Sequence, residues 1–275
     1  NLVGSLGGAE DHTRNFSNYA LVMALGSFIG PLAGGVSIDT FGHARSYLYV
    51  AAFPLVPVMI LAFVRNVGRG PRVKSEEEQA VLSTSLLANP ALRRMLIASA
   101  MAVTGQDLFQ FYMPIYGHSV GLSGSAIGAV LGMFGVAAFF SRIWLPALVK
   151  RWGPDAVFNR ALYVAAAAFV LFPLFSTAPT LAAIALVLGL GMGCAQPVTL
   201  MLIYSRAPAG RSGEALGMRV TINQFVHIVM PVVFGSLGTI LGMAPVFLAN
   251  ALILAGGGFL NRERKQPQIN TDKHR

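Results

Sequence analysis

The side chains with the most chemical potential in this sequence are an acid and an imidazole that lie inside apolar stretches. Asp107 lies in the apolar run at 95–116, and His227 lies near the middle of the run at 214–240. Ionisable groups are costly in such surroundings and are kept there mainly for function. We expect Asp107 to exchange a proton or to meet a cationic substrate, and His227 to take part in proton coupling. The alternatives are a structural carboxylate at Asp107 and ordinary hydrogen bonds between helices at His227.

Other polar residues lie near these two at helical spacing. Arg219, Asn223 and His227 are four residues apart, so they share one helix face. Arg219 is nearer the helix end, where its side chain could instead extend to the membrane interface. The candidates for lining a substrate cavity are Gln106, Gln110, Tyr112, Gln196, Thr199, Asn223 and Gln224.

The elements that carry these residues are apolar runs of nearly membrane-spanning length. Of the 275 residues, 55% are hydrophobic and only 11% are charged. A soluble domain of this size could not bury so much apolar side chain. We therefore predict an all-α fold, a polytopic bundle of membrane helices. Its eight candidate spans are 18–38, 45–64, 95–116, 124–149, 156–176, 180–204, 214–240 and 244–261.

The basic residues that give the chain a net charge of +9 are confined to alternate connections between these runs. This bias predicts that both termini and the 66–92 loop are cytoplasmic. It also makes nucleic acid an unlikely partner. Cys194 is the single cysteine and no Cys/His cluster has metal-ligand spacing, so we expect no metal, and we expect no other cofactor either.

The last two runs repeat the first two at an offset of 200 residues. Pro31 matches Pro231, and Gly42 matches Gly242. Parallel repeats are a known transporter architecture, and a complete repeat would place four further helices before residue 1. We thus predict that this chain contains eight helices of an inferred twelve, which form two pseudo-symmetric halves of six helices each. The predicted units are the end of the first half (1–65), a central loop (66–92), the second six-helix half (93–265) and a tail (266–275).

Glycines punctuate the runs at 18–38 and 180–204. Gly26, Gly30 and Gly34 share one face, where another helix could approach closely, and Pro31 bends this helix. Gly189, Gly191 and Gly193, followed by Pro197, predict a bending point in the later run.

The stretch from Gly26 to Gly35 resembles the fifth-helix antiporter motif of the major facilitator superfamily, although the Gly expected nine residues earlier is Ser17. Leu148 to Gly153 resembles the second copy of the family's G-x-L-x-D-R-x-G loop, with Lys150 in place of the acid. The residues that the resemblance and the sequence together assign to motifs and gating are Gly26, Gly30, Pro31, Gly34, Gly35, Arg142, Arg151, Gly153 and Arg219. For Arg142, simple extension to the interface is an equal alternative to a gate.

The resemblance implies a secondary transporter in the bacterial inner membrane that exports a small molecule in exchange for protons and works as a monomer when full length. Uptake of a sugar, amine or organic acid is the alternative within this class. A non-transporting membrane protein is a further alternative. An intramembrane enzyme is disfavoured, because no paired aspartates or activated nucleophile appear in the sequence.

Overall fold

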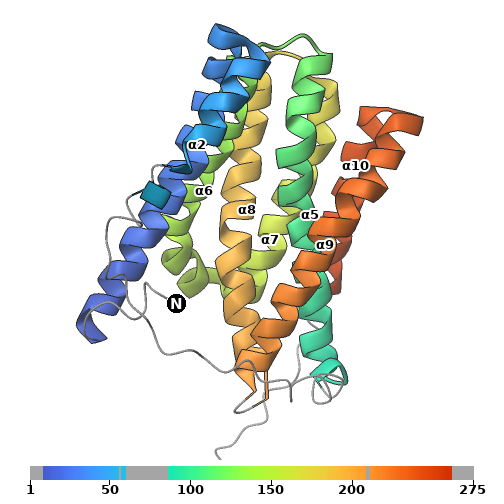
Figure 1. Cartoon of the computed structure of the whole chain (residues 1–275). Helices are drawn as coiled ribbons and strands as arrows, with labels where there is room; N and C mark the ends of the chain where they lie inside the picture. The colour runs from blue at the N-terminus through green and yellow to red at the C-terminus, as the bar shows by residue number, and fades with distance from the viewer. Residues whose placement is uncertain (1–8, 56, 60–85, 209–210, 262–275) are drawn as a thin grey trace, which may run out of the picture.

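The computed structural model describes residues 9–55, 57–59, 86–208 and 211–261. Most of the predicted central loop and all of the predicted tail lie outside these ranges. Within them the chain is a bundle of long helices, and no strand is assigned there (Figure 1). The helices are α2 (Ala9–Ala52), α5 (Pro90–Ser119), α6 (Gly124–Trp152), α7 (Pro154–Leu171), η2 (Phe172–Leu174), α8 (Ala178–Arg206), α9 (Ser212–Leu241) and α10 (Met243–Leu260).

Five helical segments in the described part of the chain are long and apolar enough to cross a membrane. They are Gly124–Trp152, Pro154–Leu174, Ala178–Arg206, Ser212–Leu241 and Met243–Leu260. All five coincide with predicted spans. The predicted span at 95–116 is helical throughout within α5 but is not one of the five. Gln106, Asp107 and Gln110 lower the mean hydropathy of this helix.

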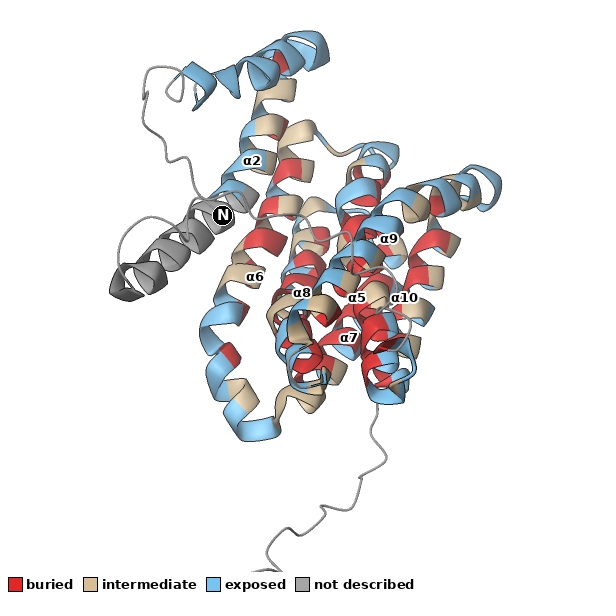
Figure 2. Cartoon of the chain, turned by 60° about the horizontal axis from the view of Figure 1, so that its bottom comes forward, coloured by how far each residue is buried: buried red, intermediate tan, exposed pale blue. Residues whose placement is uncertain are grey.

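The predicted repeat has a counterpart in the backbone. Gly42 interrupts α2 with φ 74° and ψ 166°, and Gly242 separates α9 from α10 with φ 84° and ψ −179°. Residues that carry a side chain rarely adopt a positive φ, so glycine suits both breaks. After Gly42 the chain changes direction and continues as helix to Ala52 (Figure 2). The predicted helix at 18–38 and the first part of the one at 45–64, up to Ala52, are thus present. A turn at Phe53 and Pro54 breaks the second helix.

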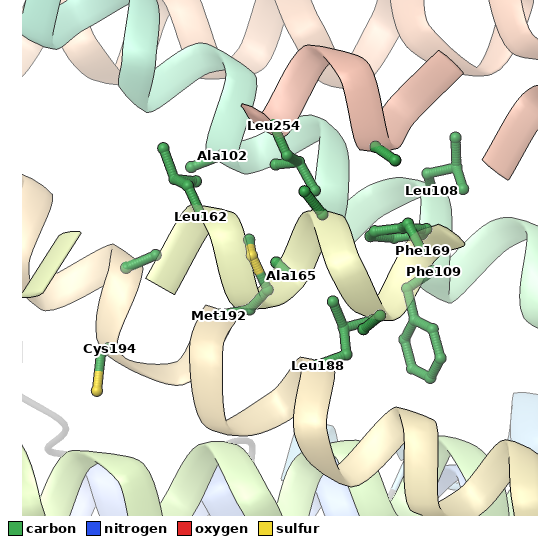
Figure 3. Packing of buried hydrophobic residues seen from close by; sticks show 14 of the residues in the cluster. Ala102, Leu108, Phe109, Leu162, Ala165, Phe169, Leu188, Met192, Cys194 and Leu254 are labelled. Carbon is green, nitrogen blue, oxygen red and sulfur yellow. The ribbon is translucent and has the colours of Figure 1, made fainter. Parts of the chain in front are cut away.

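The core lies between α5, α7, α8 and α10. Aromatic rings join these helices: Phe109 packs on Phe172 with ring centroids 5.6 Å apart, and Phe172 stacks on Phe247 at the same distance. Figure 3 shows Phe109 and Phe169 beside Leu188 of α8. Burial along the helices is uneven, because 56% of the apolar window of α8 is buried but only 11% of that of α9. Few residues of α9 are buried, and the helix is mostly coloured as exposed or intermediate in Figure 2.

Glycines of α8 are packing positions in this structure, and the bending predicted for this helix during transport stays a prediction. The helix is continuous from Ala178 to Arg206. A methyl group added to Gly193 would lie 2.6 Å from Cα of Ala138 on α6, and one added to Gly189 would lie 2.4 Å from the carbonyl oxygen of Phe134. The small residues let the two backbones touch, which is how helices pack in membranes.

Gly26, Gly30 and Gly34 make no close helix contact within the described part of the chain, where a methyl group on any of them would meet nothing within 4 Å. Their packing role stays a prediction. The contact of α2 with α6 is instead made at Gly35, where an added methyl group would lie 2.1 Å from the carbonyl oxygen of Gly124. Gly128 of α6 similarly approaches Pro31. The contacting face is rotated by one residue from the row of three glycines.

Candidate functional site

A cavity of about 360 Å³ lies between α2, α5, α6 and α8. Several predicted residues meet in it, because α5 contributes Gln106 and Gln110, α6 contributes Arg142 and α2 contributes Pro31. Phe109, Phe134 and Phe139 form apolar walls. This volume falls within the usual range for small-molecule pockets, and its few polar groups on apolar walls fit such a role.

Asp107 faces away from this cavity and toward α9. Its Oδ2 lies 2.5 Å from Nδ1 of His227, so the two predicted proton-exchange residues form one hydrogen-bonded pair. The Asp107 side chain is 10% exposed, whereas that of His227 is 45% exposed. The pair therefore has a shielded end at Asp107 and an open end at His227, so the imidazole is the member that a proton can reach first. Asp107 and Gln106 are adjacent in sequence, which places the pair directly behind the cavity wall.

Arg219 lies within the bundle and joins three helices. It is buried, and its Nε donates to Oγ of Ser99 on α5 at 3.2 Å while a terminal nitrogen donates to Oε1 of Gln196 on α8. It forms no ion pair with any described carboxylate. Asn223, one turn further along α9, is also buried, and its Oδ1 has no hydrogen-bond partner. The polar residues that were predicted to share one face of α9 therefore contact both α5 and α8.

The other predicted residues are placed less centrally. Thr199 is buried and its hydroxyl donates to the carbonyl of Ala195 in its own helix. Tyr112 packs near Gly235 and Gly238 of α9, away from the cavity. Gln224 is exposed, as is Arg151, whose guanidinium lies 5.7 Å from the ring centroid of Trp152. Gly153 ends α6 with φ 79°.

One residue with a clear structural role was missed by the sequence reading. Asp39, near the turn of α2, accepts hydrogen bonds from the backbone amides of Gly124 and Ser125, both at 2.7 Å. These are free amides of the first turn of α6, so Asp39 caps that helix from another part of the chain. A local sequence pattern cannot predict this cap, because Asp39 lies 85 positions before Gly124 in the chain. The contact closes this end of the bundle beside a second cavity of about 590 Å³.

We expect Asp39→Ala to loosen the closure between α2 and α6. Hydrogen bonds from the side chain and then the amide of Ser125, and from the amide of Gly124, lower the pKa of Asp39 below 3.8. The stabilising effect is therefore complete above pH 3.8 and is lost as the pH falls through the lowered pKa. The probe is Leu131→Cys, because Leu131 lines both cavities. The measurement is the rate at which this cysteine is labelled by an impermeant maleimide, added on the side of the membrane where Asp39 lies.

At neutral pH the Asp39→Ala variant should label several-fold faster than the parent. Acid slows the reaction of the thiol itself in both proteins, so the quantity to compare is the ratio of the two rates, which should approach one as the pH falls below about 4. The matched control is Thr40→Ala, because the Thr40 hydroxyl bonds only within its own helix. Equal labelling of the parent and the Asp39→Ala variant at all pH values would show that the cap does not hold the closure.

Taken together, the membrane-length helices, the polar cavity and the paired ionisable residues define an integral membrane helical bundle built around a small-molecule-sized cavity. The model of the Major Facilitator Superfamily matches residues 1–231, and the chain belongs to this family.

Relatives with known names are distant. The chain is 23% identical over 231 residues to Multidrug resistance protein MdtG of Klebsiella pneumoniae (strain 342), which covers 82% of this chain and 56% of the relative. It is 24% identical over 250 residues to Uncharacterized MFS-type transporter YuxJ of Bacillus subtilis (strain 168), covering 84% and 61%. The chain thus spans less than two thirds of the length of these relatives.

A solved structure has the same fold. It is a bacterial homologue of the iron transporter ferroportin in an inward-facing state, with a TM-score of 0.60 and 18% sequence identity. The match covers 94% of this chain and 64% of that one. The chain therefore shares the arrangement of helices of that structure. The family matched by the sequence points to a transporter and not to an enzyme.

Proposed function

We propose that the protein is a secondary active transporter that exports a small molecule in exchange for protons. The observation that carries the proposal is the Asp107–His227 pair, which lies directly behind the cavity wall formed by Gln106 and Gln110. A carboxylate and an imidazole in contact can pass a proton between the open and the shielded end of the pair. The relatives named for multidrug resistance favour export over uptake.

The proposal includes the predicted architecture of the whole protein. Helices α5 to α10 form the second half, α2 closes the first half, and further helices before residue 1 would complete the cavity. The exposed face of α9 supports this assignment, because few of its apolar side chains are covered within the described structure. We further propose an inner-membrane location with both chain ends cytoplasmic and a functional monomer.

The test uses energised inverted vesicles that contain the whole protein, with the internal pH recorded while small organic molecules are added. Release of protons from the vesicles on addition of a substrate would support antiport. Proton movement in the opposite direction would instead support the alternative, proton-coupled uptake. A protein that binds substrates without moving protons would contradict coupling.

A further inference from the structure

The central cavity has an uncompensated positive charge. Of the residues that line it within the described structure, Arg142 alone is charged, and none is acidic. Arg142 is exposed and forms no hydrogen bond or ion pair with another described residue. The one described carboxylate close behind the wall, Asp107, is turned toward His227. Among the described residues, the cavity therefore offers a guanidinium that no acidic lining residue neutralises.

Such a group selects the chemistry of its ligand. A guanidinium within the membrane is unfavourable unless an anion pairs with it. Arginine binds carboxylate and phosphate groups through two parallel N–H bonds. Gln106 and Gln110 add amide donors on the opposite helix, while Phe109, Phe134 and Phe139 offer an apolar surface for the rest of the molecule. A cationic ligand would meet a like charge here.

From this arrangement we infer that the transported molecule is a small organic anion with an apolar body, and that Arg142 binds its acidic group. The inference rests on the proposed function, since it names the substrate class of the same cavity. It also replaces the gate predicted for Arg142 with a direct contact to the substrate.

The test compares three probes of one shape: 4-phenylbutyrate, the neutral 4-phenylbutyramide and the cationic 4-phenylbutylamine. Their affinities are measured by equilibrium binding to the whole protein in phosphatidylcholine vesicles. We expect the carboxylate to bind at least tenfold more tightly than the amide, and the amine to bind most weakly. Arg142→Gln should weaken carboxylate binding roughly 10- to 100-fold, the range for a charged hydrogen bond, and leave amide binding unchanged.

The matched control is Arg160→Gln, an exposed arginine of α7 outside the cavity lining, which should change none of the three affinities. Tighter binding of the amine than of the carboxylate would overturn the inference. So would an equal loss of acid and amide binding in Arg142→Gln, because that result indicates a structural role.

The two proposals fail separately. Amine binding accompanied by proton release would reject the anion assignment and leave proton exchange intact. Carboxylate binding that depends on Arg142, without any proton movement, would support the anion site and contradict the proposed coupling.

Discussion

Replacing Asp107 with asparagine should reduce substrate-driven proton movement to the level of vesicles without the protein. Asparagine has nearly the shape of aspartate and can still accept a hydrogen bond from His227, but it cannot take up or release a proton. The cavity wall at Gln106 and Gln110 is not changed by the substitution. We therefore expect the dissociation constant of the substrate to change by no more than about twofold. That is well under the tenfold change that corresponds to about 1.4 kcal/mol of binding free energy. The measurement is proton flux and substrate binding on the same vesicles.

The control for this result is Asp155→Asn. Asp155 also pairs with a basic residue, Arg206, but it lies at the start of α7 and does not line the cavity. It should keep proton coupling. His227→Gln tests the other partner and should impair coupling as well, since the open end of the pair is lost. Normal proton flux in Asp107→Asn would remove Asp107 from the mechanism.

The second large effect is expected at Gly193, where α8 touches α6. Gly193→Ala places a methyl group 2.6 Å from Cα and 2.7 Å from the carbonyl oxygen of Ala138, and neither backbone atom can rotate away. Overpacking of this kind costs about 1–3 kcal/mol. The midpoint of thermal unfolding should fall by roughly 2–4 °C for each kcal/mol. Since Gly193 also lines the central cavity, substrate binding should weaken.

The comparison variant is Gly256→Ala in α10, where an added methyl group meets nothing within 4 Å. Alanine is the better helix former by up to about 1 kcal/mol, so this variant should be as stable as the parent or slightly more stable. Thermal unfolding followed by the fluorescence of a thiol-reactive dye measures both variants. An unchanged midpoint for Gly193→Ala would mean that the two helices can separate freely at this level.

Local patterns in the sequence predicted the helices well. Apolar length and Pro or Gly boundaries located α6 to α10, and the repeat anticipated the matching backbone breaks at Gly42 and Gly242. The pairing of Asp107 with His227 was among the alternatives, since each residue was expected to meet a polar group from another helix. The sequence could not say that each would be the partner of the other, because 120 positions separate them.

Contacts that depend on how helices rotate against each other could not be predicted. The spacing of Gly26, Gly30 and Gly34 predicts a close contact on their face, whereas the close contact of α2 within the described residues is made by Gly35, next to that row. A rotation of one residue about the helix axis, 100°, decides between the two faces, and only tertiary packing sets it. Asp39 was missed for the same reason, since its partners are the amides of a helix that begins far along the chain.

The most direct test of the account is solute movement driven by a proton gradient alone. The whole protein is reconstituted in vesicles that are loaded with an acidic buffer and placed in a neutral one, with equal concentrations of 4-phenylbutyrate on both sides. Proton exchange through Asp107 and His227 predicts that the solute accumulates inside as protons leave, and that Asp107→Asn abolishes this accumulation. Solute that stays at equal concentrations on the two sides, while isotope exchange shows that it crosses, would contradict proton coupling.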